Sequence, residues 1–246
     1  VKEHRRIMAT LTNMIDEVSM NLSGYTLTQD RSTYLRTAVT AVASSSASPT
    51  TLSLGSTDNV GKGIVEIDEE LMWIDTYDRV GNTATVAPYG RAYLGTTLAA
   101  HAVDAKVTIS PTFPRFSIKR AINDTIKGLS GILFAADTTT ITYSSAVSTY
   151  RLPATGNSLG IRNILSVAYE SVGPSKEWIP IRSWRLDSNA NSTAFTSEQT
   201  ISIYDMITSG RTIQIVYSTD PTPFTTNADI FTDTTGLPES CKDLII

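Results

Sequence analysis

The pattern of apolar and polar positions predicts two amphipathic helices, in residues 8–22 and 115–134. In each segment apolar residues recur at spacings of three and four, so they form one stripe. We expect the first helix to end at Gly24, because glycine commonly closes helices. Since neither helix alone can bury its stripe, we predict that the two pack antiparallel. They would form a helical core of residues 8–43 and 111–136.

Between the helices the pattern changes to the alternation of half-buried strands. It predicts an inserted antiparallel β domain in residues 51–110. The acidic run Asp68-Glu69-Glu70 separates two alternating segments and predicts the tip of a hairpin. The segment before this domain, residues 25–43, is mixed. It fits a short helix, a strand or a bent connector.

From residue 137 to residue 217 the chain holds short segments rich in β-branched and aromatic residues, separated by turn signals. Strands at this spacing are typical of a β-sandwich, so we predict a second, sandwich-like β domain. We expect Trp178 and Trp184 to supply core and edge bulk rather than a ligand platform. The predicted strands are residues 139–143, 148–152, 161–169, 177–181, 183–186, 200–204 and 212–217.

The last segment, residues 218–246, is rich in turn-forming and acidic residues, so we predict an extended C-terminal arm. Within it, Leu237-Pro238-Glu239 predicts the start of a short helix. Three apolar residues close the sequence, so we expect either that more chain follows or that they dock into a neighbour. The candidate docking residues are Phe224, Ile230, Phe231, Leu244, Ile245 and Ile246. Taken together, the elements predict an α+β fold.

Composition and charge narrow the function classes. Hydrophobic residues make up 41% of the 246 residues, and no apolar run reaches the ~20 residues of a membrane helix. A net charge of −4 argues against a dedicated nucleic-acid binder, which needs clustered Lys and Arg. Residues 58–79 carry seven acids against two basic residues. We interpret this stretch as a solvated face, or else as a surface that repels phosphate or binds a basic partner.

Three basic residues, Lys119, Arg120 and Lys127, share the polar arc of the second predicted helix. Such a cluster is usually a hydrated helix face. It is also the candidate surface for contact with DNA phosphates or with an acidic partner protein.

No residue pattern predicts catalysis. The chain has two histidines and one cysteine, and it lacks both a nucleophile elbow and a glycine-rich phosphate loop. Adjacent carboxylates in residues 68–70 point in different directions along a strand, so we expect no metal site. We therefore predict no enzyme, no metal and no cofactor. A hydrolase would need paired carboxylates, for which the candidate cluster is Glu66, Asp68 and Glu70.

One stretch of the sequence resembles a known module. After two alternating strands separated by Asp68-Glu69-Glu70, the chain carries in order Arg91, Gly95-Thr96, His101 and Ala105-Lys106-Val107. This order resembles a module common in tailed-bacteriophage virion proteins. Two positions depart from its usual pattern. Ala92 stands where a glycine usually follows the arginine, and Asp104 stands in place of the glycine of a Gly-Ala pair.

The wider layout is similar to that of the head-to-tail connector (adaptor) proteins of tailed phages. The resemblance implies a structural virion protein of the neck, bound to the portal protein above and to a head-closure or tail protein below. It also implies a homo-oligomeric ring, usually dodecameric, through which double-stranded DNA passes without sequence-specific binding. The alternative is a tail, baseplate or fibre module that binds host glycans, with stacking platforms at Trp73, Tyr89, Trp178 and Trp184.

Overall fold

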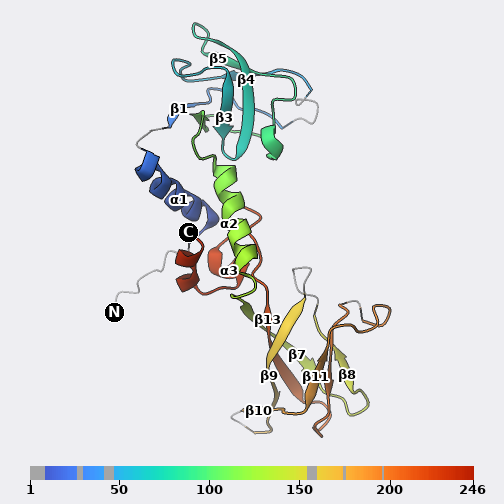
Figure 1. Cartoon of the computed structure of the whole chain (residues 1–246). Coiled ribbons are helices and arrows are strands. Elements are labelled where there is room, and N and C mark those ends of the chain that lie inside the picture. Colours follow the sequence, from blue (N-terminus) through green and yellow to red (C-terminus); the bar gives the residue numbers. More distant parts are fainter. Residues whose placement is uncertain (1–8, 27–29, 42–46, 154–159, 174–175, 196) are drawn as a thin grey trace. The chain divides into compact units, whose positions relative to one another are not determined.

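The computed structural model describes residues 9–26, 30–41, 47–153, 160–173, 176–195 and 197–246 (Figure 1). The fold is α+β, as predicted, and the described strand pairs all run antiparallel. The chain divides into two compact units: residues 13–122, and residues 1–12 together with 123–246. This division cuts through both long helices, so the predicted partition into four domains stays a prediction.

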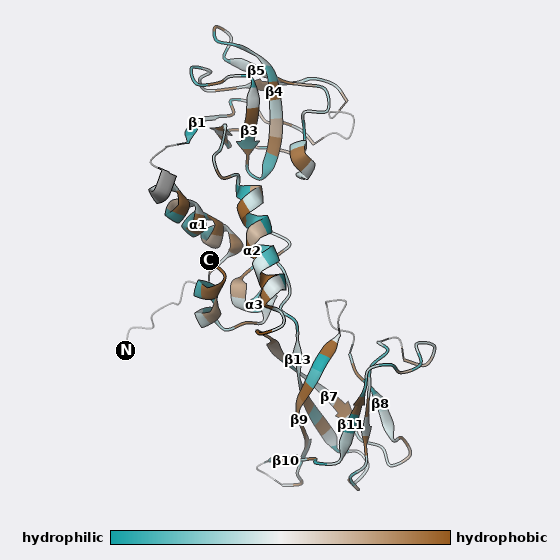
Figure 2. Ribbon diagram, viewed as in Figure 1, coloured by the Kyte–Doolittle hydropathy of each residue, from teal (hydrophilic) through white to brown (hydrophobic). Residues whose placement is uncertain are grey.

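Both predicted helices are present, with shifted ends. The helix α1 (Leu11–Thr26) runs past Gly24, so the prediction that this glycine ends the helix is wrong. A glycine inside a helix costs only ~1 kcal/mol relative to alanine, which the remaining turns can offset. The helix α2 (Arg115–Leu129) begins where predicted, and Figure 2 shows hydrophobic and hydrophilic residues alternating along it. An ion pair at 2.5 Å joins Arg115 to Asp16 of α1, while the antiparallel pairing of the two helices stays a prediction.

In the unit of residues 13–122, six strands form one sheet in the order β1-β6-β3-β4-β5-β2. A bridge between Leu35 and Leu54 joins the two outer strands, so this barrel-like sheet curves until its edges meet. Of the alternatives open for residues 25–43, a strand is therefore present. The strands are β1 (Arg31–Tyr34), β2 (Thr50–Ser53), β3 (Gly63–Ile67), β4 (Glu70–Asp78), β5 (Thr83–Val86) and β6 (Lys106–Ile109).

Alternate side chains of these strands fill the barrel-like sheet. Its core includes Val65, Ile67, Met72, Ile74, Ala84, Val86, Val107 and Ile109. The predicted hairpin tip is confirmed, because Asp68 and Glu69 form the turn between β3 and β4. Asp68 takes a φ of 56° there, and Ile67 lies opposite Glu70. Glu70, however, is the first residue of β4 and is buried.

The second unit contains a four-stranded sheet in the order β10-β9-β13-β7 and a three-stranded sheet in the order β11-β12-β8. One hydrophobic cluster draws residues from both, among them Ile201 and Ile215. All seven predicted strands are present, and the sandwich-like arrangement stays a prediction. The strands are β7 (Ala135–Thr142), β8 (Thr149–Arg151), β9 (Ile161–Glu170), β10 (Trp178–Pro180), β11 (Trp184–Asp187), β12 (Thr200–Ile203) and β13 (Thr212–Thr219).

The C-terminal arm is folded, so the prediction of an extended arm is wrong. Phe224 and Phe231 are buried, and their ring centroids lie 6.4 Å apart. The side chain of Asn123 exchanges two hydrogen bonds with the backbone of Phe224, and Ile230 forms a β-bridge with Thr10. The turn-rich sequence therefore buries aromatic residues of its own and is hydrogen-bonded to distant parts of the chain. The arm holds the short helices α3 (Phe231–Thr235) and η3 (Glu239–Leu244), of which η3 begins at the predicted Leu-Pro-Glu signal.

Candidate functional site

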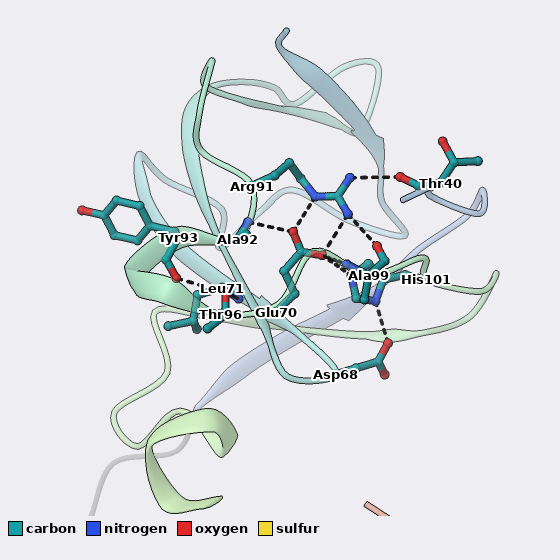
Figure 3. A network of polar contacts seen from close by, with 10 residues as sticks. All are labelled: Thr40, Asp68, Glu70, Leu71, Arg91, Ala92, Tyr93, Thr96, Ala99 and His101. Atoms are coloured by element: carbon teal, nitrogen blue, oxygen red, sulfur yellow. Dashed lines mark hydrogen bonds and ion pairs between the residues drawn. The ribbon is translucent and has the colours of Figure 1, made fainter. Parts of the chain in front are cut away.

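The carboxylate of Glu70 is the centre of a buried polar network (Figure 3). Its Oε1 accepts hydrogen bonds from Arg91 Nε at 2.7 Å and from the N–H of Ala92 at 2.9 Å. Its Oε2 accepts from Arg91 Nη2 at 2.8 Å, from the N–H of Ala99 at 3.0 Å and from His101 Nε2 at 2.9 Å. The side chains of Glu70, Arg91 and His101 are 0% exposed. Buried charges are costly unless they are paired and hydrogen-bonded, and this carboxylate is both.

Arg91 connects this carboxylate to two further segments. Its Nη2 also donates to the carbonyl of Ala99 at 2.6 Å, and its Nη1 donates to the carbonyl of Thr40 at 3.3 Å. One guanidinium therefore ties together β4, the loop between β5 and β6, and the segment that precedes β2. The hydroxyl of Thr96 adds another tie between this loop and β4, because it accepts the N–H of Leu71 at 3.1 Å.

Both ring nitrogens of His101 face carboxylate oxygens. Nδ1 lies 2.6 Å from Asp68 Oδ2, and Nε2 lies 2.9 Å from Glu70 Oε2. An ionised carboxylate only accepts hydrogen bonds, so both nitrogens donate and the ring is an imidazolium. Burial opposes this charge, but hydrogen bonds to the two carboxylates outweigh it and raise the pKa of His101. Burial alone would also raise the pKa of Glu70, yet the hydrogen bonds from Arg91 and His101 lower it to about 2.

The loop that carries Arg91 has an unusual backbone. Ala92, Leu94 and Asp104 have φ values of 50°, 56° and 66°, in the left-handed region. This region costs an ordinary residue with a Cβ ~1–2 kcal/mol. Ala92 and Asp104 are the two positions at which this sequence lacks the module's usual glycine. The backbone keeps the conformation that suits glycine there, and the hydrogen bonds around Glu70 hold the loop in it.

The arrangement supports a structural role rather than a catalytic one. With a pKa of about 2, Glu70 is ionised at neutral pH and cannot act as a general acid. Glu66, another carboxylate of the hydrolase hypothesis, accepts the N–H of Arg115 at 2.6 Å and so caps α2. Burial raises the pKa of Glu66 to about 7, against the hydrogen bonds from the backbone of Arg115 and Phe116. Within the described residues, no group of three or more His, Cys, Asp and Glu side chains could hold a metal ion.

The acids of residues 58–79 do not all lie on a solvated face, because Glu66 and Glu70 are buried. The exposed acids are Asp58, Asp68, Asp75 and Asp78. Glu69 pairs with Lys119 at 3.0 Å, and Asp75 pairs with Lys62 at 2.6 Å. Asp68, Glu70 and Glu66 make the contacts given above. Five of the seven acids are therefore engaged with cations or with the N-terminus of α2.

The three basic candidates on α2 have different surroundings. Lys119 is engaged with Glu69, and its side chain is 17% exposed. Arg120 and Lys127 are exposed. Contact of these residues with DNA or with a partner protein stays a prediction.

The structure also separates the arm residues expected to dock onto a partner. Phe224, Phe231 and Ile245 are buried, and Leu244 is 64% exposed. Ile230 and Ile246 are partly buried. Leu244 is therefore the accessible docking candidate among the six.

The aromatic residues proposed for glycan stacking belong to different units. In the unit of residues 13–122, Trp73 packs against the ring of Tyr93 at 5.5 Å, and Tyr89 is exposed. In the other unit, Trp184 packs against the hydrophobic cluster of the two sheets, as its prediction as core bulk requires. Trp178 is 43% exposed on β10.

The described residues include no helix that is both long enough and apolar enough to span a membrane. A sequence model of the family described as SU10 adaptor protein matches residues 92–245, more than half of the chain. No curated protein and no solved structure matches. The matched region begins within the loop of the buried network and ends in the C-terminal arm. It therefore overlaps the module-like stretch of residues 63–107 only at its end.

Proposed function

The chain belongs to the SU10 adaptor protein family, a family of phage head–tail adaptors, and from this premise we propose that it forms a ring between the portal and the tail. The family is one of structural virion proteins that interact with other virion components, and it is not an enzyme family. The observation that carries the proposal is the match over residues 92–245. That region includes α2, both sheets of the second unit and the folded arm.

The proposed ring is a homo-oligomer, dodecameric by resemblance, with the portal protein on one side and a head-closure or tail protein on the other. A ring subunit needs two different surfaces that meet by rotation about the ring axis. We propose that the two long helices and the sheets of residues 135–219 supply these surfaces. Each unit has a hydrophobic cluster of its own.

We further propose that double-stranded DNA passes through this ring without sequence-specific binding. Attractive contacts to phosphates would hold the DNA and slow its passage. The net charge of −4 supports this function. So do the intramolecular ion pairs of Lys62, Arg91, Arg115 and Lys119, because these cations are already engaged by carboxylates.

Electron microscopy of the purified protein and of the intact virion tests the proposal. We expect rings with a central opening, formed by the protein alone or after addition of portal, and density at the head–tail junction. A protein that stays monomeric and never binds portal would refute the ring. Density at a baseplate or fibre would instead favour the glycan-binding alternative.

A further inference from the structure

The strand β7 (Ala135–Thr142) is an edge strand whose usual protection is limited to one charged residue, Asp137. It lies at the end of the four-stranded sheet, and its one partner among the described strands is β13. Its eight residues include no proline, lysine or arginine, and its pairing with β13 has no bulge. Proteins normally place such devices on edges, because free N–H and C=O groups there pair with strands of other molecules.

The other described sheet edges are protected or short. The barrel-like sheet closes on itself at a bridge. On the far edge of the four-stranded sheet, Ile181 donates its N–H to Val167 of β9. Pro180, one residue earlier, therefore faces the open side of β10, and it has no N–H to offer there. The strands β8 and β11 are three and four residues long. Among the described sheet edges, β7 is thus the long one with little protection.

The register with β13 decides which backbone groups of β7 are free. The N–H of Tyr143 donates to the carbonyl of Arg211 at 2.8 Å, in line with the strand register. Facing residues of an antiparallel pair alternate between hydrogen-bonded and non-hydrogen-bonded positions. The backbone N–H and C=O groups of the even-numbered residues of β7 therefore point away from β13. Asp137 Oδ1 accepts the N–H of Thr138 at 2.7 Å. The outward residues are Ala136, Thr138, Thr140 and Thr142, and all four are exposed.

We propose that β7 pairs antiparallel with β7 of a second copy of this chain, which would join two four-stranded sheets into one. The partner must offer an edge of the same length and the same spacing of free groups, and β7 itself meets both requirements. In one register, Thr139 lies opposite its own copy, Thr138 lies opposite Thr140, and Ala136 lies opposite Thr142. Each copy's four outward N–H and four outward C=O groups then find partners, and the N–H of Thr138 exchanges Asp137 Oδ1 for the carbonyl of Thr140 in the second copy.

Side chains favour the same register. Asp137, the one charged residue of β7, lies opposite Ile141 and not opposite its own copy, so like charges stay apart. Threonine faces threonine at the centre, a cross-strand pair that sheets favour. The contact is two-fold, so it is separate from the head-to-tail contacts of the proposed ring and does not rest on them.

Disulfide trapping tests the register. In a Cys241→Ser background, Thr139→Cys places two thiols opposite each other, with Cα atoms about 4.5 Å apart, within reach of a disulfide. We expect a covalent dimer on mild oxidation. The matched control is Thr142→Cys on the same strand, which lies opposite Ala136 and should stay uncrosslinked. Failure of Thr139→Cys to crosslink, or equal crosslinking of both variants, would overturn the register.

Sedimentation velocity of the full chain over a range of concentrations tests the contact itself. We expect a reversible dimer whose dissociation constant rises about tenfold or more in Thr140→Pro, because two intermolecular hydrogen bonds are lost. Should that variant fold poorly, Thr140→Lys places a charge at the edge with a similar effect. Ser166→Lys adds the same charge to β9, away from the edge, and should leave dimerisation unchanged.

A wild-type chain that is monomeric at every concentration would overturn the contact, as would equal weakening by Thr140→Lys and Ser166→Lys. Rings that persist in Thr140→Pro after the dimer is lost would support both this contact and the proposed function as separate interfaces. A wild-type chain that forms the dimer but no rings would count against the proposed function alone.

Discussion

The substitution Arg91→Met should destabilise the barrel-like sheet strongly. In the wild-type chain Arg91 donates two hydrogen bonds to the carboxylate of Glu70, and both side chains are 0% exposed. Methionine fills much of the same volume but donates nothing. The carboxylate would then remain buried with His101 as its one charged partner.

The magnitude follows from the burial of this pair. Removal of one partner from a buried ion pair costs ~3–5 kcal/mol, because the other charge is left without compensation. The exposed pair Lys62–Asp75 is the matched control, since its side chains are 64% and 46% exposed. Loss of such a surface pair through Lys62→Met should cost ~0–1 kcal/mol. The double variant Glu70→Gln with Arg91→Met should be more stable than Arg91→Met alone, because it no longer buries a carboxylate without its guanidinium partner.

Hydrogen exchange measured by mass spectrometry is the suitable assay. The chain has two compact units, so a single global unfolding transition does not report on one of them. Peptides of residues 63–109 should exchange faster in Arg91→Met, while peptides of residues 135–219 serve as an internal control. Acidification should also destabilise this variant less than it destabilises wild type, as measured by protection factors that are corrected for the intrinsic slowing of exchange at lower pH. Without the guanidinium, one of the hydrogen-bond donors that lower the pKa of Glu70 is missing, so protonation of Glu70 costs the folded state less.

Either of two results would refute this role of Arg91 as the partner of the buried Glu70 carboxylate. One is an Arg91→Met variant whose exchange matches that of Lys62→Met. The other is an Arg91→Met variant that loses stability on acidification as wild type does. Both results would mean that the carboxylate of Glu70 is solvated and that the network does not hold the loop.

Three further predictions concern pH, backbone and arm. The contribution of Glu70 to the free energy of unfolding should be complete above pH 4.5 and lost as pH falls toward 2. The contribution of His101 should be complete below pH 6.5 and lost as pH rises through its raised pKa. Hydrogen exchange of residues 63–109 across pH, corrected for its intrinsic pH dependence, checks both limbs, and His101→Gln should flatten the alkaline one. Ala92→Gly should raise the free energy of unfolding by up to ~1 kcal/mol, since it relieves a left-handed φ. Ala121→Gly in α2 should lower it by ~1 kcal/mol, and hydrogen exchange in residues 13–122 that changes in the same direction for both variants would contradict this. Phe231→Ala should cost ~3–5 kcal/mol and expose residues 220–245 to protease, so an unchanged cleavage pattern would show that the arm does not depend on this ring.

The elements of this fold could be predicted from the sequence because periodicity is a local property. Spacings of three and four located both helices, and segments rich in β-branched and aromatic residues between turn signals located all seven strands from residue 135 to residue 219. The order of an acidic turn, Arg91, Gly95-Thr96 and His101 indicated a phage virion protein, and the wider layout indicated the adaptor family, without any knowledge of where those side chains lie. Local signals were weakest at helix ends, where Gly24 is tolerated inside α1.

Only the tertiary structure decided which charges meet. The sequence predicts that Glu70 is one acid of a turn. Its partners in the structure, Arg91 and His101, lie 21 and 31 residues away along the chain. Lys119, read as a free basic residue, is engaged with Glu69, 50 residues away. The arm looked turn-rich and poor in core residues, but it buries Phe224 and Phe231 and is hydrogen-bonded to Asn123 and Thr10 from distant parts of the chain. Such contacts depend on strand register and chain topology. Neither register nor topology produces a periodic pattern in the sequence, so composition and spacing could not reveal these contacts.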